Sequence, residues 1–291
     1  MAKKLRTRRH TVVLSRSAGG DAWITAFLII LGVLMFLPLY YTVIQAFKPL
    51  DELFYFPPKF YVVNPTWDNF SDLFKLMSES WVPFSRYIFN TVFITVFGTL
   101  GNLLFSCLCA YALSKIPFPG HGFFFQLIQK SLMISATVGG IITFIIISKL
   151  GLMDNVLAVI VPAWASTLGL YLMKQFMDTN VNTSVLESAR LDGASEFRTF
   201  LTIAMPMVKP AWLTVIIYSF QGLWNSGASL YIHSEELKTL NYAMGQILTA
   251  GIARSGASAA SGVIMMAVPI IVFVISQSKI IETMGSSGMK D

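Results

Sequence analysis

Six stretches of the chain contain no Asp, Glu, Lys, Arg or His, and each is 18 to 28 residues long. A helix needs about 20 apolar residues to cross the ~30 Å hydrocarbon layer of a membrane. Lipid cannot satisfy backbone hydrogen bonds, so only helices and closed barrels span it, and uninterrupted apolar sequence excludes barrel strands. The sequence therefore predicts an all-α integral membrane protein with six transmembrane helices, over residues 22–47, 87–114, 131–148, 155–173, 210–232 and 255–278. We expect the third helix to extend back through residues 122–129.

The composition excludes a soluble or disordered chain. Of the 291 residues, 55% are hydrophobic and 12% are charged, whereas about a quarter of a soluble domain is charged. The mean hydropathy is +0.65. A net charge of +6 would suggest a nucleic-acid partner for a soluble protein. In a membrane protein the same excess follows from topology, so we expect contact with membrane lipid and no nucleic-acid partner.

The distribution of Lys and Arg predicts the orientation. Six predicted spans place both termini on one side, and that side carries 13 Lys and Arg residues, against 7 on the other. The positive-inside rule then places both termini in the cytoplasm and the loop at residues 48–86 outside. This loop is rich in Pro, aromatic and acidic residues. It is either a packed external cap or a docking site for an external partner, and the sequence does not separate the two.

The chain shows no pattern for metal, redox or ATP chemistry. Cys107 and Cys109 are two residues apart in an apolar run, and the three His residues are scattered. We therefore predict no disulfide, no metal site and no cofactor bound by this chain. The phosphate-binding pattern G-x4-G-K-[ST] is absent from the sequence. The protein is thus not expected to be an enzyme that hydrolyses ATP by that route.

The loop between the fourth and fifth predicted spans reads as two short helices joined by a turn. Ser184 and Glu187 have the spacing of a capping box, in which Ser184 would be the N-cap. Gly193 can adopt a positive φ and would form the turn. Ser195 would cap the second helix, and Pro206 would stop or kink it before the fifth span. An apolar elbow of this kind needs its own spans or another protein to cover it.

The same segment resembles the EAA loop of ABC importer permeases, which has the form E-A-A-x3-G-x9-I-x-L-P. In this chain the motif reads Glu187-Ser188-Ala189, three residues ending at Asp192, Gly193, nine residues, and Ile203-Ala204-Met205-Pro206. The departures are Ser188 for Ala and Met205 for Leu, and both preserve size or hydrophobicity. Similarity to the six-span carbohydrate permeases of the maltose type covers residues 22 to the end, including Trp224-Asn225 and Thr239-Leu240. The tail at residues 282–291 is similar to tails in the branch that handles oligosaccharides of plant or algal polysaccharides.

The resemblance implies a type I ABC importer permease fold and a bacterial cytoplasmic membrane location. It divides the chain into a basic cytoplasmic segment (1–21), a first span with its external loop (22–85), a permease core with the coupling loop at about 183–206 (86–281), and a cytoplasmic tail (282–291). It also implies a second permease subunit in a heterodimer, an ABC ATPase dimer that holds ATP and Mg, and an extracytoplasmic solute-binding protein. The implied function is ATP-driven, binding-protein-dependent uptake of a sugar, and within that class of an oligosaccharide.

Two groups of residues are candidates for function. The first is the coupling set of the motif, in which Glu187 would pair with a basic residue of the ATPase while Leu186 and Ala189 fill the apolar part of its cleft. The second is a set of polar and aromatic residues on the fifth span, which either line a sugar path or join helices to one another. This second set comprises Tyr218, Gln221, Trp224 and Asn225.

Two other functions compete with sugar import. One is an ABC permease for a non-sugar solute, which the loop motif does not exclude. The other is an ion-coupled secondary transporter, which would need carboxylates or another ion relay within the membrane. The six predicted spans contain no Asp or Glu, and this favours the ABC permease.

Overall fold

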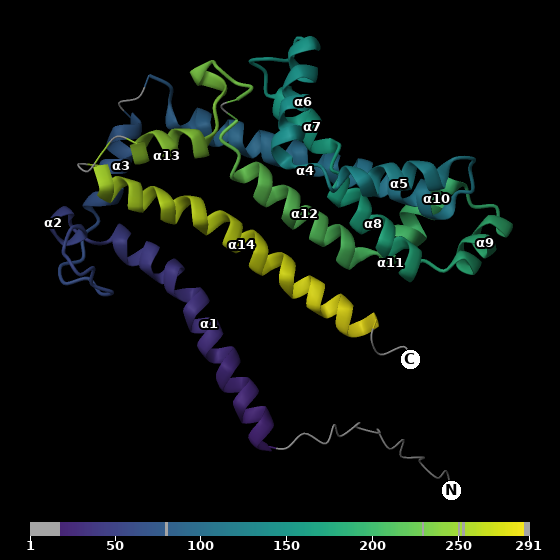
Figure 1. The fold of residues 1–291 in the computed structure, drawn as a ribbon, viewed down its shortest axis with the longest axis horizontal. Coiled ribbons are helices and arrows are strands. Elements are labelled where there is room, and N and C mark those ends of the chain that lie inside the picture. Colours follow the sequence, from purple (N-terminus) through teal and green to yellow (C-terminus); the bar gives the residue numbers. More distant parts are fainter. Residues whose placement is uncertain (1–17, 79–80, 229, 250, 252–253, 288–291) are drawn as a thin grey trace, which may run out of the picture.

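A computed structural model describes residues 18–78, 81–228, 230–249, 251 and 254–287. Most of the basic segment at 1–21 and the end of the 282–291 tail lie outside these residues. Every regular element in the described ranges is helical, as predicted (Figure 1). The helices are α1 (Ala18–Ala46), α2 (Leu50–Leu53), α3 (Asp68–Ser78), α4 (Phe84–Lys115), α5 (His121–Ser131), α6 (Ala136–Lys149), α7 (Leu157–Trp164), α8 (Thr167–Asn180), α9 (Thr183–Leu191), α10 (Glu196–Thr199), α11 (Met205–Met207), α12 (Lys209–Trp224), α13 (Leu240–Thr249) and α14 (Ser255–Ser287). A π-helical turn (Phe200–Ala204) joins α10 to α11, and a 3-10 turn (Glu235–Leu237) precedes α13.

Four helices of the described chain are long and apolar enough to cross a membrane. They are Gly19–Ala46, Phe84–Lys115, Leu157–Asn180 and Ser255–Gln277, and they match the first, second, fourth and sixth predicted spans. Two bent helix pairs bring the number of candidate spans to six if each pair counts as one. The six-span prediction is therefore supported, with one bend within the third span and another at the start of the fifth.

The third predicted span is not the continuous helix that was expected. It divides into α5 and α6, whose axes differ by 111°. Ser135 adopts an extended conformation (φ −56°, ψ 138°) at the start of α6. The Ser131 hydroxyl donates to the carbonyl of Ile128 at the end of α5. A serine can end a helix by such local bonds, and apolarity alone gives no sign of the break.

The fifth predicted span is longer than the helix that forms there. Helix α12 begins at Lys209 and ends at Trp224, so residues 225–232 lie outside it. Pro210 occupies the first turn of α12, where its missing N–H breaks no helical hydrogen bond. Val208 is not helical (φ −104°, ψ 23°), and the chain bends by 84° there between residues 196–207 and α12. The bend separates the fifth span from the elbow that precedes it.

Helix α4 is the centre of the bundle and packs against α7, α8 and α12. Its small residues allow close approach. A Cβ on Gly101 would lie 2.0 Å from Nε1 of Trp164, and that nitrogen donates to the Phe97 carbonyl at 3.0 Å. A Cβ on Gly98 would meet the side chain of Leu223. Small residues are typical of helix contacts in membranes, because lipid offers no hydrophobic driving force for association.

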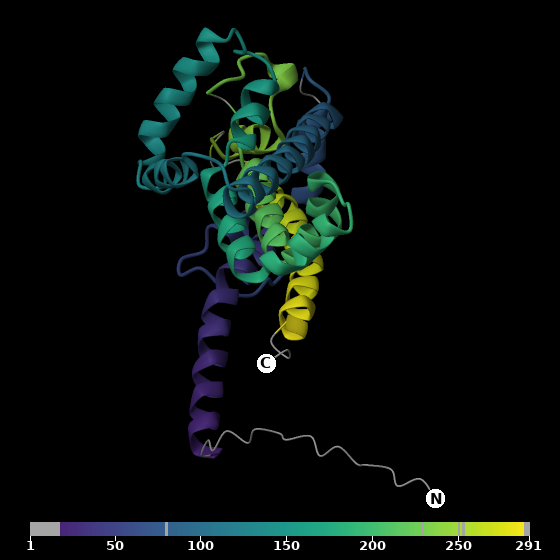
Figure 2. The same ribbon diagram turned by 90° about the vertical axis from the view of Figure 1, so that its right-hand side faces the viewer.

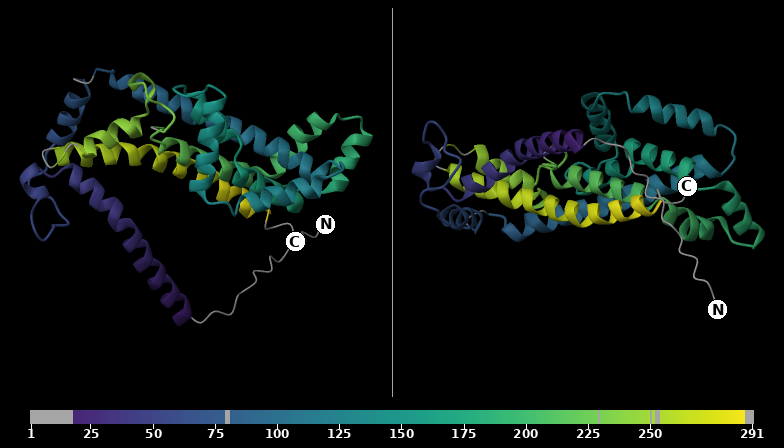
Figure 3. Two further views of the ribbon diagram at one scale, coloured as in Figure 1. Left: turned by 45° about the horizontal axis from the view of Figure 1, so that its top comes forward. Right: turned by 90° about the horizontal axis from the view of Figure 1, so that it is seen from below.

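Residues 47–78 and 81–83, between α1 and α4, form a packed cap at one end of the bundle, while α9 and α10 lie at the other (Figures 1 and 3). Asn69 is buried, and its amide donates to the carbonyls of Ala46 and Lys48 at 2.9 and 2.7 Å. Gly256 of α14 approaches so closely that a Cβ would lie 2.0 Å from Oδ1 of Asn69. The cap thus joins the end of α1 to the start of α14.

The first half of α1 lies apart from the other helices. The C-terminal end of α1 packs near α14, and the helix diverges from the bundle toward its N-terminal end (Figures 1 and 2). Its most apolar 18-residue window buries none of its residues within this chain. A surface of this kind is stable only in contact with lipid or another apolar protein surface.

Candidate coupling elbow and polar cavity

The elbow, residues 183–207, begins with a helix cap that differs from the predicted one. The side chain of Asn182 accepts the N–H of Ser184 at 3.4 Å and is the N-cap of α9. The predicted capping box of Ser184 and Glu187 is therefore wrong, because the helix starts two residues earlier, at Thr183. The hydroxyl of Ser188 donates to the Ser184 carbonyl at 3.0 Å, and Glu187 is exposed. The Glu187 carboxylate is thus presented to the surroundings of the chain.

The turn of the elbow is formed as predicted. Gly193 has a φ of +80°, in the left-handed region. Its N–H donates to the Arg190 carbonyl at 3.0 Å, and the Ala194 N–H donates to the Ala189 carbonyl at 3.0 Å. These bonds close the end of α9. A Cβ on Gly193 would meet nothing within 4 Å, so only the backbone conformation selects glycine here.

The second arm begins at the predicted cap and ends at the bend before α12. Ser195 accepts the N–H of Arg198 at 3.4 Å and caps α10. The arm then continues through the π-helical turn to α11, where Pro206 occupies the first turn. Pro206 therefore lies just ahead of the bend at Val208, as expected of a residue that ends the elbow.

A charged pair connects the two arms and links them to α4. The Arg190 guanidinium donates from Nε to Oε1 of Glu196 at 2.6 Å and from Nη2 to Oε2 at 3.2 Å. The Tyr111 hydroxyl of α4 also donates to Oε2 of Glu196, at 3.1 Å. Arg190 holds the pKa of Glu196 below its ordinary value, with a smaller contribution from Tyr111. The carboxylate is therefore charged at neutral pH, and one group joins α9, α10 and α4.

The apolar residues of the elbow divide into a buried and an exposed set. Leu186 is fully buried in a cluster with α4, α8 and α12, which includes Tyr111, Met177 and Val208. The prediction that Leu186 fills the cleft of a partner is therefore wrong, since its own chain covers it. Five other large apolar side chains of the elbow are exposed: Val185, Leu191 (89% exposed), Phe197 (63%), Leu201 and Met207.

The sequence predicts an exposed apolar elbow, but it assigns the partner contact to Leu186 and Ala189 and not to these side chains. The direction from which α4 approaches α9 decides which side of a nine-residue helix is covered, and the sequence does not give that direction. Leu191 directly precedes Asp192, so its exposed side chain lies beside the turn at Gly193. The elbow therefore presents apolar side chains around the Gly193 turn while Leu186 fixes α9 to the bundle.

A small polar cavity lies among α4, α8 and α12. Asn102 donates from Nδ2 to the Ser219 hydroxyl at 3.2 Å and accepts the Ser106 hydroxyl at 2.9 Å through Oδ1. The three side chains are buried. The adjacent cavity has a volume of about 150 Å³ and also touches Gly169 and Tyr218. Polar side chains buried at membrane depth normally face protein or water, and here Asn102 and Ser219 face both protein and the cavity.

The four predicted pathway residues are not equivalent in the structure. Tyr218 and Gln221 are exposed, and Tyr218 borders the polar cavity. Asn225 is exposed, donates to the Gln221 carbonyl at 2.9 Å, and accepts the side chain of Asn241 through its own carbonyl. Trp224 is instead 5% exposed, and its Nε1 donates to the Met265 carbonyl of α14 at 3.2 Å. Trp224 therefore joins α12 to α14 and does not share the exposed face of Tyr218 and Gln221.

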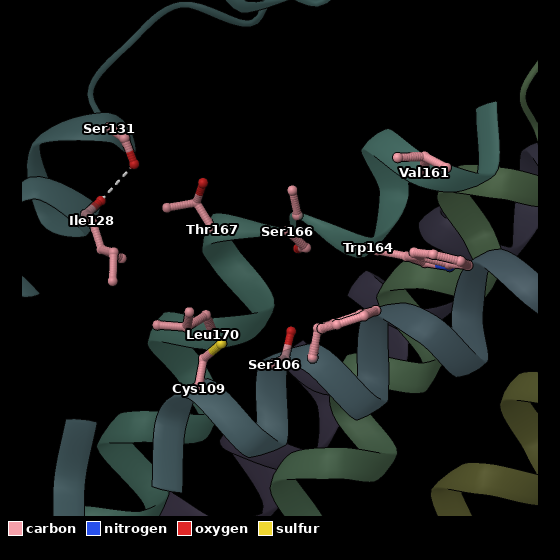
Figure 4. Close-up of a pocket in the computed structure, with 11 residues that line it drawn as sticks. Ser106, Cys109, Ile128, Ser131, Val161, Trp164, Ser166, Thr167 and Leu170 are labelled. Carbon is pink, nitrogen blue, oxygen red and sulfur yellow. Dashed lines mark hydrogen bonds between the residues drawn. The ribbon is translucent and has the colours of Figure 1, made fainter. Parts of the chain in front are cut away.

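A larger, mainly apolar pocket of about 400 Å³ is lined by residues of α4, of α5 and of the junction of α7 with α8 (Figure 4). Ile128 and Ser131 of α5 lie on one side, and Thr167 and Leu170 of α8 lie on the other (Figure 4). Ser166 caps α8 at this junction by accepting the Gly169 N–H at 3.1 Å. The part of the chain that is described contains no cluster of three or more His, Cys, Asp or Glu side chains that could hold a metal.

The fold and the elbow together define a class of protein. It is a polytopic helical membrane subunit whose apolar elbow, between the fourth and fifth spans, is fixed to the bundle and presents side chains outward. A polar cavity lies within the same bundle. This combination is that of a transport subunit.

Comparison with known proteins identifies the family. The chain is 31% identical to the protein LplC of Bacillus subtilis over 74% of this chain and 71% of that protein. It is 30% identical to the sn-glycerol-3-phosphate transport system permease UgpE of Yersinia enterocolitica over 68% and 71% of the two chains. It is 28% identical to the B. subtilis polygalacturonan/rhamnogalacturonan transport permease YtcP over 78% of each chain. No protein-family model matches the chain.

Solved structures show the same fold. A chain of a bacterial ABC transporter that imports the acidic polysaccharide alginate superposes with a TM-score of 0.76 at 22% identity, over 90% of this chain and 98% of that one. A chain of an alginate ABC transporter in complex with a pentasaccharide-bound periplasmic protein gives a TM-score of 0.60 at 16% identity. The protein belongs to the family of permease subunits of carbohydrate-uptake ABC transporters. The expected fold class and family are therefore confirmed.

Proposed function

We propose that the chain is the translocation subunit of an importer for oligosaccharides derived from polysaccharides. The named relatives include permeases for polygalacturonan/rhamnogalacturonan and for arabinooligosaccharides. The structural neighbour imports alginate. The competing solute is a small phosphorylated polyol, because the sn-glycerol-3-phosphate permease is equally similar in sequence.

The single observation that carries the proposed role as an ATPase-coupled translocation subunit is the form of the elbow. Its turn presents exposed Leu191 and Phe197, while Leu186 is buried against three spans. A separate ATPase dimer that holds ATP and Mg would receive this surface, with Glu187, Ser188, Ala189, Asp192, Gly193 and Pro206 as the coupling set. Closure of the ATPase would then move the elbow as a lever and transmit the movement to α4, α8 and α12. Energy for transport comes from the partner.

The solute path would follow the polar face of α12. Tyr218 and Gln221 are exposed on that face, and the cavity bordered by Asn102 and Ser219 lies beneath it. Aromatic faces and amide groups are the side chains that bind sugar rings and hydroxyls. A second permease subunit would cover this face and complete the path. A solute-binding protein outside the membrane would deliver the oligosaccharide, and both termini of this chain would lie in the cytoplasm.

The experiment is purification of the tagged chain from its own membrane, followed by uptake in proteoliposomes. An ATPase and a second permease should co-purify, and labelled oligogalacturonides or alginate oligosaccharides should be taken up only with ATP and a binding protein. Glu187→Lys should release the ATPase, whereas Asp72→Lys, an exposed acid on the cap, should not. Retention of the ATPase by Glu187→Lys with full uptake would remove the coupling assignment. Uptake of glycerol 3-phosphate alone would replace the oligosaccharide with the competing solute.

A further inference from the structure

The cap contains a loop of aromatic residues that turns back along α1. Five aromatic side chains between residues 54 and 61 are exposed, and Phe56 is 96% exposed. The full set is Phe54, Tyr55, Phe56, Phe60 and Tyr61. Scattered exposed apolar residues are ordinary, but five adjacent aromatic side chains in one short loop indicate a surface that binds something.

Buried charged groups fix the base of this loop. Glu52 is 5% exposed and accepts the N–H groups of Val63 and Asn64 at 3.0 and 2.9 Å. Lys48 is 1% exposed, and its Nζ donates to the Lys59 carbonyl at 2.6 Å. These contacts hold the backbone of the loop in one position, and its aromatic side chains remain exposed.

Contacts with α1 place the loop at the depth of the membrane surface. The Tyr40 hydroxyl donates to the Phe60 carbonyl at 2.9 Å, and the rings of Tyr41 and Phe60 lie 5.6 Å apart. Tyr40 lies six residues before the end of α1 at Ala46, or about 9 Å back along the helix axis. The loop thus returns toward the membrane and lies beside the end of α1 (Figures 1 and 2).

The length of α1 defines that depth further. Its 29 residues extend about 43 Å, and a centred hydrocarbon layer of ~30 Å would occupy roughly residues 22–42. Tyr40 and Tyr41 then lie at the edge of the hydrocarbon, and the 54–61 loop lies at the level of the lipid headgroups. Tyr and Trp rings are enriched at this level in membrane proteins.

The charge of the loop suits the same environment. The Nζ of Lys59 lies over the rings of Tyr55 and Tyr61, 5.0 and 5.7 Å from their centroids. Long basic side chains near span ends extend to lipid headgroups while their methylene groups cover apolar surface. One Lys among five aromatic rings matches a surface of acyl chains and phosphates better than it matches water.

We propose that the 54–61 loop is a lipid anchor that inserts into the membrane interface at the C-terminal end of α1. The anchor would fix the C-terminal end of α1, whereas the N-terminal end of this helix diverges from the bundle. The proposal rests on α1 crossing the membrane and not on coupling to an ATPase. Only the choice of leaflet, the external one, depends on the orientation proposed above.

Spin labelling of the full chain tests the anchor. A nitroxide is placed at Phe56→Cys and, as a matched control in the same cap, at Lys75→Cys on α3, whose side chain is 69% exposed. Cys107 and Cys109 are replaced by Ala, and the protein is reconstituted in vesicles of phosphatidylethanolamine and phosphatidylglycerol. We expect the ratio of collisions with oxygen to collisions with Ni-EDDA to be several-fold higher at residue 56 than at residue 75.

Two results would overturn the anchor. Equal ratios at the two positions would place the loop in water, and protection of residue 56 from both reagents would mean that protein covers it. Bimane on the same cysteine gives an independent readout, because brominated acyl chains should quench it and aqueous iodide should not. Repeating both measurements on the chain purified with its partners separates the proposals, since failure of partners to co-purify leaves the lipid measurement intact.

Discussion

Arg190 and Glu196 lie on opposite sides of the Gly193 turn, and their side chains meet in a two-point contact with Nε–Oε1 and Nη2–Oε2 distances of 2.6 and 3.2 Å. The pair therefore fixes the angle between the two arms of the elbow. The same carboxylate accepts the hydroxyl of Tyr111 from α4. A movement imposed on the elbow would reach α4 through this group as well as through buried Leu186.

We predict that Glu196→Gln uncouples transport more than it destabilises the protein. An amide carries no charge and has one acceptor oxygen in place of two, so it loses the two-point, charged contact with Arg190. The pair is partly exposed, so its contribution to stability is about 1 kcal/mol or less. The oligosaccharide transported per ATP hydrolysed should fall, while the amount of assembled complex stays near that of the native protein.

The matched control is Asp72→Asn, which removes the exposed Asp72–Lys75 pair of the cap and should leave coupling unchanged. The pH dependence of Glu196 gives a second test. Its pKa is lowered from the ordinary 4.5, so the pair persists as pH falls and is lost only below that value. Loss of coupling between pH 6 and pH 5 would contradict this role for Glu196.

Substitution of Gly193 should reveal the cost of its left-handed backbone. The position has open space around it, so Gly193→Val adds backbone strain of roughly 1–2 kcal/mol without a clash. Gly193→Asn should be tolerated, because Asn adopts the left-handed region more readily than a β-branched residue. We expect ATPase retention on the purified permease to fall for Val and to persist for Asn. Equal retention by both variants would show that the turn does not depend on a positive φ.

The sequence predicts those features of the molecule that local chemistry decides. Continuous apolar runs predict the spans, the αL turn follows from Gly193, and the second cap follows from Ser195. The break between α5 and α6 contains no Pro and no charge, so its local signal is weak. The burial of Leu186 and Trp224 depends on which helices pack beside them, and this is a long-range property. Both residues lie in regular patterns that fit a buried or an exposed position equally well.

Gly169→Ala should destabilise the protein, because it adds a Cβ next to the polar cavity. A Cβ there would lie 2.8 Å from Oγ of Ser106 and 2.9 Å from Oδ1 of Asn102, and these two atoms already bond to each other. Overpacking of this kind costs about 1–3 kcal/mol. The melting temperature of the solubilised protein should fall. Gly139→Ala on α6, where a Cβ meets nothing within 4 Å, is the control, and an equal fall in both variants would exclude overpacking as the cause.

The orientation can be tested with single cysteines in a background without Cys107 and Cys109. Asn64 in the cap and Ser184 in the elbow are both exposed in the structure, so a difference in labelling reports their side of the membrane. The excess of Lys and Arg predicts that a membrane-impermeant maleimide labels Asn64→Cys in intact cells and labels Ser184→Cys only after lysis. The reverse labelling pattern would show that the chain has the opposite orientation, with the elbow outside the cell, where there is no ATP.

Trp224 and Tyr218 should give different phenotypes, because one joins helices and the other borders a cavity. Trp224→Phe keeps an aromatic ring but leaves the Met265 carbonyl without its donor, which costs about 1 kcal/mol. Trp224→Ala also removes most of a buried side chain, at about 3–5 kcal/mol. Both variants should lower the amount of assembled complex, with Ala the more severe.

Tyr218→Ala should instead leave assembly unchanged and lower uptake, through a higher half-saturating concentration of oligosaccharide. The measurement is uptake normalised to complex in proteoliposomes. If Tyr218→Ala leaves normalised uptake kinetics unchanged, then Tyr218 is not part of the path; if Trp224→Phe lowers normalised uptake at full assembly, then its bond to α14 serves transport and not packing alone.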